Sequence, residues 1–253
     1  MMSRISWIPF LTCAVLCLQT ATPQIAVDFE LCRYSDPVCN TNVAKLLLKK
    51  YATTGVRSLN FPPVDPLNIK SLKLPPNPNS AINVGLSFTN VNIRGLSNAQ
   101  NIKVEGFTRD VSAPITLSCT VPKATFSGAY EGDGTILGAN FKGKGNCEIE
   151  LTDINLNCKI DAKLVQKDGK NYLVINNVSL GISKPASVHY QFDGLYNGNP
   201  ELTATANDFL NANSFEVYEG MRPGIQEIFA VLVQEYMGKV FGKWAYDDLF
   251  VPQ

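Results

Sequence analysis

Few residues of this chain have the types and spacing that enzyme chemistry requires. The chain has 253 residues and one histidine, His189, which alternates with apolar neighbours and is therefore expected on the polar face of a strand. Serine-histidine chemistry needs a base oriented toward the nucleophile, and a solvent-facing strand position does not supply one. Gly143-Lys-Gly145 is too short for a phosphate-binding loop, no Gly-x-Ser-x-Gly elbow is present, and Asp247-Asp248 is expected to be solvated. The sequence predicts a protein that is not an enzyme.

The cysteines form a second chemically distinct group. Cys32 and Cys39 enclose Asp36-Pro37, a turn dipeptide that can bring their Cα atoms within disulfide range, so we predict a bridge between them. Cys13 and Cys17 lie in the apolar run near the start of the chain. The remaining three cysteines have neither Cys-x-x-Cys nor Cys/His spacing, so no metal site is expected at Cys119, Cys147 and Cys158. Either Cys119 reaches one of the other two across strands, or all three are buried thiols. The spacing leaves both alternatives open.

The first residues have the features of a secretory signal peptide. Arg4 precedes a short apolar run over residues 7–18, and small and polar residues follow near Ala21. The run is shorter than the roughly 20 apolar residues that span a bilayer. We therefore expect residues 1–21 to be a signal peptide, residues 22–253 to form a single domain, and the protein to be secreted without integral membrane association.

Charge and composition restrict the class of partner. The chain has 22 basic and 22 acidic residues and a formal net charge of zero, which argues against nucleic acid or an anionic membrane surface as the main partner. Hydrophobic residues make up 45% of the chain, enough for a sizeable core. No cofactor is expected.

The middle of the chain has the period-two alternation of antiparallel strands. The alternation changes parity near Asn90, which predicts a bulge there. If residues 145–166 form one strand, it far exceeds the usual length of about five or six residues. Lys167-Asp-Gly-Lys170 predicts a hairpin turn. On the returning strand, either both faces are partly covered at first or a bulge at Asn176-Asn177 switches the buried face.

Helical periodicity appears on both sides of the strands. One helix is expected over residues 43–51 and ends before Gly55, and the other carries an apolar stripe over residues 215–240. Pro223-Gly224 is expected to kink or split the second helix. Long antiparallel strands with bulges form a strongly curved sheet. We predict an α+β fold, in which a highly curved, long-stranded antiparallel sheet wraps around a long C-terminal helix, with a short N-terminal helix.

Several blocks along nearly the whole chain carry a resemblance to a known family. They are Cys32–Cys39 with the helix after it, Gly55–Leu67 ending in Asp-Pro-Leu, Asn90–Ser97, Pro122–Tyr130 followed by Gly134 and Gly143-Lys-Gly145, Lys167–Leu173, Leu195–Gly198 with Asn207–Asn213, and Asp248-Leu-Phe250. In order and spacing these blocks resemble the insect takeout and haemolymph juvenile-hormone-binding proteins, a branch of the tubular lipid-binding proteins.

The resemblance implies an interior tunnel for an apolar small molecule and a secreted carrier in haemolymph or another extracellular fluid. It also implies that Tyr130 meets the polar end of the ligand. Juvenile-hormone binders carry a second disulfide between later cysteines, a pairing that this chain does not obviously reproduce. The resemblance therefore favours the takeout branch of the family, and it argues against juvenile hormone itself as the ligand.

Two functions follow as hypotheses. The first is a carrier of a terpenoid, fatty acid or similar lipid, in a cavity lined by Leu86, Phe88, Leu117, Phe126, Tyr130, Val174, Val178, Phe215, Tyr218, Ile225 and Phe229. The alternative is a secreted interaction or signalling protein with a filled core, which acts through its surface, for instance on a cell-surface receptor. The chain's one Asn-x-Ser/Thr sequon, at Asn177, lies opposite the face of Val178 and is predicted to point outward and be glycosylated.

Overall fold

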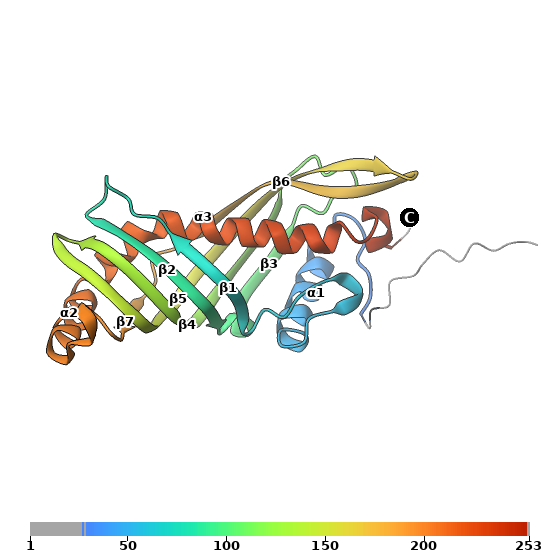
Figure 1. Cartoon of the computed structure of the whole chain (residues 1–253). Coiled ribbons are helices and arrows are strands. Elements are labelled where there is room, and N and C mark those ends of the chain that lie inside the picture. Colours follow the sequence, from blue (N-terminus) through green and yellow to red (C-terminus); the bar gives the residue numbers. More distant parts are fainter. Residues whose placement is uncertain (1–26, 28, 252–253) are drawn as a thin grey trace, which may run out of the picture.

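The computed structural model describes residue 27 and residues 29–251. A curled antiparallel sheet holds one long helix in its curve, and shorter helices lie near its two ends (Figure 1). The segment predicted to be a signal peptide, residues 1–21, lies outside the described part. The helices and strands are α1 (Pro37–Lys50), β1 (Leu67–Leu74), β2 (Ile82–Arg94), β3 (Gln100–Glu105), β4 (Ile115–Ile136), β5 (Ala139–Lys167), β6 (Lys170–Ile182), β7 (Ser187–Phe192), α2 (Pro200–Ala212) and α3 (Ser214–Phe241).

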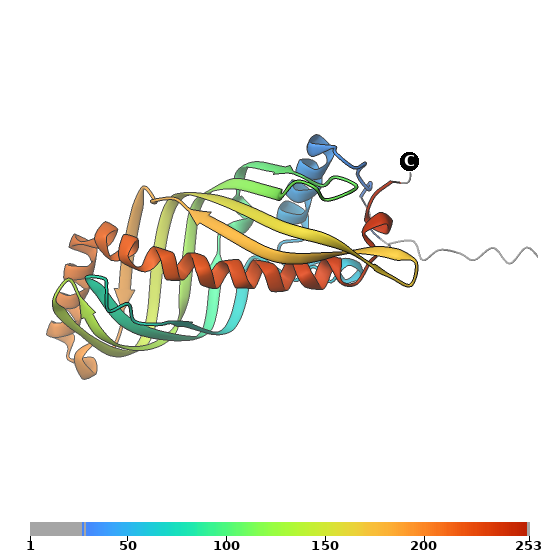
Figure 2. The same ribbon diagram turned by 90° about the horizontal axis from the view of Figure 1, so that it is seen from above.

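The sheet has seven strands and is built around two of unusual length. Its order is β1-β2-β4-β5-β6, with β3 paired to β4 and β7 paired to β5. Strand β4 has 22 residues and β5 has 29, and the two pair over the whole length of β4. Strand β5 then pairs with β7 along one part and with β6 along another. The predicted continuous strand over residues 145–166 is therefore confirmed, and it joins the two ends of the molecule (Figure 2).

The bulge predicted near Asn90 is present, and β6 has a second bulge. The pairing of β2 with β4 shifts register between Thr89 and Asn92, where Asn90 has a φ of 53°. In β6, Asn177 pairs with Asp161 and Ile175 pairs with Ala162, so Asn176 is the extra residue of a bulge. The bulge switches the face that is buried, from that of Leu173 before it to that of Val178 after it. This decides between the two alternatives that the sequence left open.

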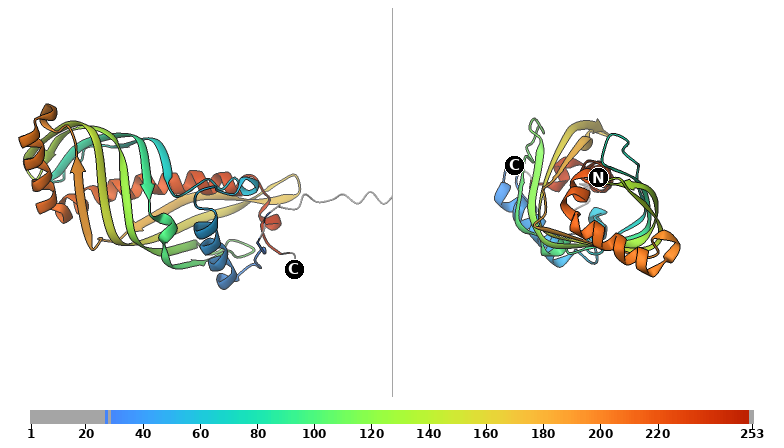
Figure 3. Two further views of the ribbon diagram at one scale, coloured as in Figure 1. Left: turned by 90° about the horizontal axis from the view of Figure 1, so that it is seen from below. Right: turned by 90° about the vertical axis from the view of Figure 1, so that its left-hand side faces the viewer.

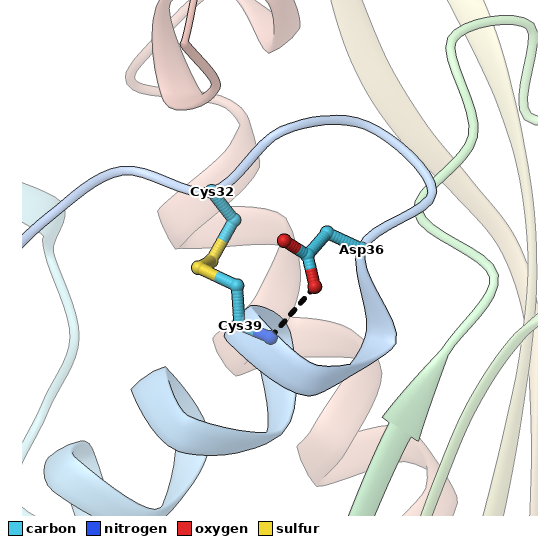
Figure 4. Close-up of a disulfide and its surroundings, with 3 residues drawn as sticks. All are labelled: Cys32, Asp36 and Cys39. Atoms are coloured by element: carbon cyan, nitrogen blue, oxygen red, sulfur yellow. Dashed lines mark hydrogen bonds between the residues drawn. A yellow bond between two sulfur atoms is a disulfide. The ribbon is translucent and has the colours of Figure 1, made fainter.

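The Cys32–Cys39 bridge forms as predicted and lies where α1 begins (Figure 4). The carboxylate of Asp36 accepts a hydrogen bond of 2.9 Å from the backbone N–H of Cys39, so Asp36 caps the helix. Pro37 follows at the start of the helix, where a missing N–H costs nothing. The disulfide and the cap fix the same turn, which explains why the local sequence was sufficient to predict it.

Replacing Cys32 by alanine should destabilise the fold by about 2–3 kcal/mol, because a closed loop of this length restricts the unfolded chain by that amount. Thermal unfolding followed by circular dichroism measures the change, and the folded spectrum should keep its sheet signal. The double variant Cys32→Ala/Cys39→Ala is the control, since reductant should lower the melting temperature of the wild type and leave the double variant unaffected. Free thiols at both positions in material made through the secretory pathway would contradict the bridge.

The other described cysteines are free and buried. Cys119 pairs with Leu156 in the sheet, Cys158 with Leu117, and Cys147 with Gly128. Burial raises the pKa of the Cys147 thiol to about 12 and that of Cys158 to about 11, so both stay protonated at neutral pH. Of the two alternatives, buried inert thiols are the correct one.

The short helix α2 closes one end of the sheet through two asparagine side chains. The amide of Asn207 accepts a bond of 2.9 Å from the Phe192 N–H and donates one of 2.8 Å to the Phe192 carbonyl. One turn later, Asn211 makes the same pair of bonds to Tyr190, both at 2.8 Å. These amides satisfy the free edge of β7, whose other edge pairs with β5.

Helix α3 runs the length of the molecule inside the curve of the sheet (Figures 2 and 3). Of the expected kink or split at Pro223-Gly224, the split is wrong, because one helix continues from Ser214 to Phe241 and the break lies at Asn213, between α2 and α3. The glycines near Pro223 serve close packing instead. A Cβ at Gly220 would come within 2.3 Å of Ile82, and one at Gly224 within 2.5 Å of Leu74. The helix is therefore held against β1 and β2 at points where a larger residue would not fit.

Candidate binding site in the interior

The interior between α3 and the sheet is apolar, and its middle is only half-buried. The backbone of α3 lies closest to β6 and next to β7, β1 and β2, the outer strands of the curl, rather than to the long central strands. Between Met221 and Phe241, no residue of α3 is fully buried. The half-buried apolar side chains that pack on the central cluster from both sides include Phe126, Ile149 and Leu151 from the sheet, and Ile225, Ile228, Phe229 and Leu232 from α3.

At the α2 end, aromatic rings fill the interior. The ring of Phe192 lies edge-on to Tyr130 and to Phe141, with centroid separations of 4.8 and 5.7 Å. A cavity of about 10 Å³ remains there, lined by Leu86, Ile136, Phe141, Tyr190, Phe192, Leu210, Val217 and Met221. Small-molecule sites usually measure about 300–1,000 Å³, so this end of the interior is closed and has no room for a ligand.

The opposite end is also closed by aromatic side chains. Tyr34, in the disulfide loop, stacks on Phe250 with centroids 4.4 Å apart, and Tyr246 meets Phe250 edge-on at 5.0 Å. The backbone N–H of Val251 donates to the carbonyl of Cys32 at 2.9 Å, which ties the C-terminal segment to the disulfide. The interior is thus an aliphatic and aromatic trough with an aromatic closure at each end.

Three tyrosine hydroxyls of the interior are bonded to backbone carbonyls. Tyr130 donates to Asp193 at 2.7 Å, Tyr218 to Ser183 at 2.9 Å, and Tyr246 to Thr108 at 3.0 Å. Burial raises the pKa of each phenol, that of Tyr218 to about 12, so these groups remain neutral donors. Their bonding leaves the wall apolar toward anything enclosed.

Most of the sequence-predicted lining residues reach the central cluster. Buried in it or packed against it are Leu86, Phe88, Phe126, Tyr130, Tyr218, Ile225 and Phe229. Leu117 and Val178 belong instead to the cluster beside the disulfide and the C-terminal segment. The prediction missed residues such as Phe141, Tyr190, Phe192, Ile149 and Leu151, although the alternation of Tyr190 and Phe192 around His189 was a usable signal.

Two predicted lining residues are exposed, and these assignments are corrected. Val174 is 40% exposed because the bulge at Asn176 puts Leu173, not Val174, on the buried face. Phe215 is 36% exposed, and the ammonium of Lys184 lies 4.3 Å from its ring centroid. The phase of α3 buries Val217 and Tyr218 instead.

Tyr130 is predicted to have a structural role, because its hydroxyl already has a partner in Asp193. The variant Tyr130→Phe should lose about 0.5–1.5 kcal/mol of stability, the usual net value of one hydrogen bond. Affinity for an apolar ligand should remain unchanged. Urea denaturation and a ligand titration of both proteins measure the two quantities. A selective loss of affinity with unaltered stability would instead assign the hydroxyl to the ligand.

Groups able to do acid-base or metal chemistry do not converge on this interior. His189 is exposed and pairs with Glu150 on neighbouring strands. Within the described residues, no three or more His, Cys, Asp and Glu side chains gather in a way that would hold a metal ion. In the same part of the chain, no helix has both the length and the hydropathy needed to cross a membrane.

A long helix lies inside a curled antiparallel sheet and the interior between them is apolar, an arrangement that suits a binding protein. The chain belongs to the haemolymph juvenile hormone binding protein family, whose model matches residues 11–251. This family includes the takeout proteins of insects.

Known relatives span nearly the same length as this chain. The circadian clock-controlled protein daywake of Drosophila melanogaster is 23% identical over 241 residues, which cover 93% of this chain and 92% of daywake. A putative beta-carotene-binding protein of Schistocerca gregaria is 27% identical over 203 residues, covering 78% and 77% of the two chains. The crystal structure of Takeout 1 from Epiphyas postvittana matches with a TM-score of 0.72 at 20% identity, covering 86% of this chain and 97% of that one, which establishes the common fold.

Proposed function

We propose that this protein is a secreted carrier that encloses an apolar small molecule, such as a terpenoid or a fatty acid, between α3 and the sheet. The observation that carries the proposal is the half-buried middle of the interior. The apolar side chains of α3 between Met221 and Phe241 remain partly accessible. So do the apolar side chains of the long central strands that pack on the same cluster. Covering such a surface is favourable by about 25 cal/mol per Å², and an apolar ligand would cover it from both sides.

Support also comes from the family. Its model is named for juvenile hormone binding, and one relative carries the name of a putative beta-carotene-binding protein. Both names refer to elongated apolar molecules. The cavity of about 10 Å³ at the α2 end is too small for either, so we place the ligand in the middle of the trough, among the half-buried apolar side chains.

The direct test is organic extraction of the natively purified protein, followed by mass spectrometry. We expect one apolar molecule per chain, or saturable binding of an added fluorescent lipid. The variant Ile149→Trp, which fills the half-buried interior, should reduce binding at least tenfold. The variant Glu148→Trp is its matched control, because it puts the same ring on the exposed face of the same strand. No extractable ligand and no saturable binding would favour the alternative, a protein that acts through its surface.

Secretion is part of this proposal. The predicted signal peptide precedes the described residues, and the Cys32–Cys39 bridge is of the kind that forms in oxidising compartments. Residues 22–253 would then be the mature domain, in haemolymph or a similar fluid. A cell-surface receptor remains a second possible partner of such a carrier.

Asn177 is predicted to be glycosylated when the protein is made in insect cells. The residue is exposed and follows the bulge of β6, so its side chain is accessible to the transferase. Treatment with an N-glycosidase should lower the mass of the wild type and leave the variant Asn177→Gln unchanged. An unaltered wild-type mass would show that the sequon is not used.

A further inference from the structure

One charged side chain on the interior-facing stripe of α3 lacks a full set of partners. Among the described residues, the buried side-chain polar atoms without a hydrogen bond are Thr108 Oγ1 and Arg222 Nε. Thr108 lies two residues before Asp110, and hydrogen bonds from Ser112 lower the pKa of that carboxyl, to which the nearby Thr108 hydroxyl also contributes. Arg222 has no such explanation. A buried guanidinium N–H without an acceptor is costly, and the cost is recovered when an oxygen reaches it.

The helix period places Arg222 in line with the apolar trough. Residues separated by three or four positions share a helix face, so Tyr218, Arg222 and Ile225 form one stripe, which Phe229 continues. Tyr218, Ile225 and Phe229 all belong to the central cluster or pack on it. The guanidinium therefore lies where this apolar stripe meets the end of β6.

The existing partners of Arg222 are few. Its Nη1 lies 3.4 Å from the carbonyl of Ile182, a long contact, and its Nη2 lies 2.7 Å from the carboxylate of Glu219. That ion pair is at the surface, with side chains 35% and 38% exposed, and such pairs are weak. Arg222 thus spans from solvent to interior with donor capacity to spare.

The other cation near this end of α3 is separate from Arg222. Lys184 follows Ser183, the residue whose carbonyl accepts the Tyr218 hydroxyl, but its ammonium lies over the exposed ring of Phe215, about two helical turns before Arg222. Arg222 and its partner Glu219 are therefore the charged groups that lie where the trough meets the end of β6.

We propose that Arg222 binds the carboxylate of a long-chain apolar acid whose hydrocarbon chain lies along Ile225 and Phe229. The inference rests on the proposed carrier function and narrows it to anionic lipids. Arginine presents a planar set of donors that matches a carboxylate. Because the hydroxyls of Tyr130, Tyr218 and Tyr246 are already bonded, the guanidinium is a polar group available to orient a ligand.

The test compares cis-parinaric acid with its methyl ester, two fluorescent probes that differ in the charge of the head group. In the wild type the acid should bind more tightly than the ester. The variant Arg222→Met, whose side chain matches the arginine stem as far as Nε but lacks the guanidinium, should weaken binding of the acid by about 10- to 100-fold and leave the ester unchanged. The control Lys239→Met removes an exposed cation of the same helix, paired with Glu235, and should change neither affinity.

A further variant keeps the test decisive if Arg222→Met folds poorly. Glu219→Gln removes the carboxylate that competes for the guanidinium, and it should tighten binding of the acid while leaving the ester unchanged. Equal loss of acid and ester in Arg222→Met, or no selective change in any variant, would overturn the inference. Wild-type binding of the ester but not the acid would overturn it while leaving the carrier function intact. Binding of neither probe would overturn both.

Discussion

Replacing Asn207 by alanine is expected to lower the free energy of unfolding by about 3–4 kcal/mol. The side chain is buried and bonds to both the N–H and the carbonyl of Phe192. Alanine would leave two backbone groups of β7 buried without partners, and each such group costs about 1–3 kcal/mol. Urea denaturation of the purified variant measures the loss.

Two variants separate this explanation from simple loss of packing. Asn207→Asp keeps the shape but sets a carboxylate against the Phe192 carbonyl, so it should be at least as damaging as alanine. Asn42→Ala is the matched control, because Asn42 is an exposed helical residue and alanine favours helices. A loss below about 1 kcal/mol in Asn207→Ala would mean that water or Asn211 takes over the edge of β7.

The second large effect is expected at Asp65, where Asp65→Ala should cost about 2–3 kcal/mol. The carboxylate accepts the backbone N–H groups of Gly95, at 3.2 Å, and Ser97, at 2.9 Å, and also the Ser97 hydroxyl. Hydrogen bonds to a charged group contribute more than neutral ones. This carboxylate connects the segment before β1 to the turn that follows β2. Without it, the start of β1 and the end of β2 are no longer held together by these bonds.

The same series tests whether the charge matters. Asp65→Asn retains one acceptor oxygen and should lose about half as much stability as alanine. Asp208→Ala, at an exposed position on α2, should change stability by less than about 0.5 kcal/mol. Chemical denaturation of the three variants gives the ranking. An asparagine variant as stable as the wild type would show that the carboxylate charge contributes nothing.

Asp65 and Asn207 also show that the blocks shared with a family can contain structurally important residues without revealing what those residues contact. Asp65 and Ser97 belong to separate sequence blocks, Asn207 and Phe192 lie 15 residues apart, and nothing in their local sequence indicates that they meet. Register and curvature of the sheet bring them together. From sequence alone, an asparagine in a helix is expected to lie at the surface and to contribute little to stability. Its bonds to a neighbouring strand become apparent only in the structure.

Features that depend on neighbours in the chain were determined by the sequence itself. The Asp36-Pro37 turn and its flanking cysteines led to the correct disulfide, and alternation gave the long strand β5 and the bulge at Asn90. The Asp168-Gly169 hairpin formed because both residues adopt the positive φ that this turn needs, 52° and 77°. In each case the feature depends on residues that lie within a few positions of one another in the sequence.

Tertiary structure alone decided which side of each element faces the interior and which polar group is satisfied there. One extra residue in β6 exposed Val174, and the phase of α3 exposed Phe215. Packing of Gly220 and Gly224 against Ile82 and Leu74 let a helix continue through Pro223. The Tyr130 hydroxyl found Asp193, more than sixty residues away along the chain, while Arg222 Nε found no acceptor. Such outcomes depend on distances between remote segments, which periodicity and turn chemistry do not encode.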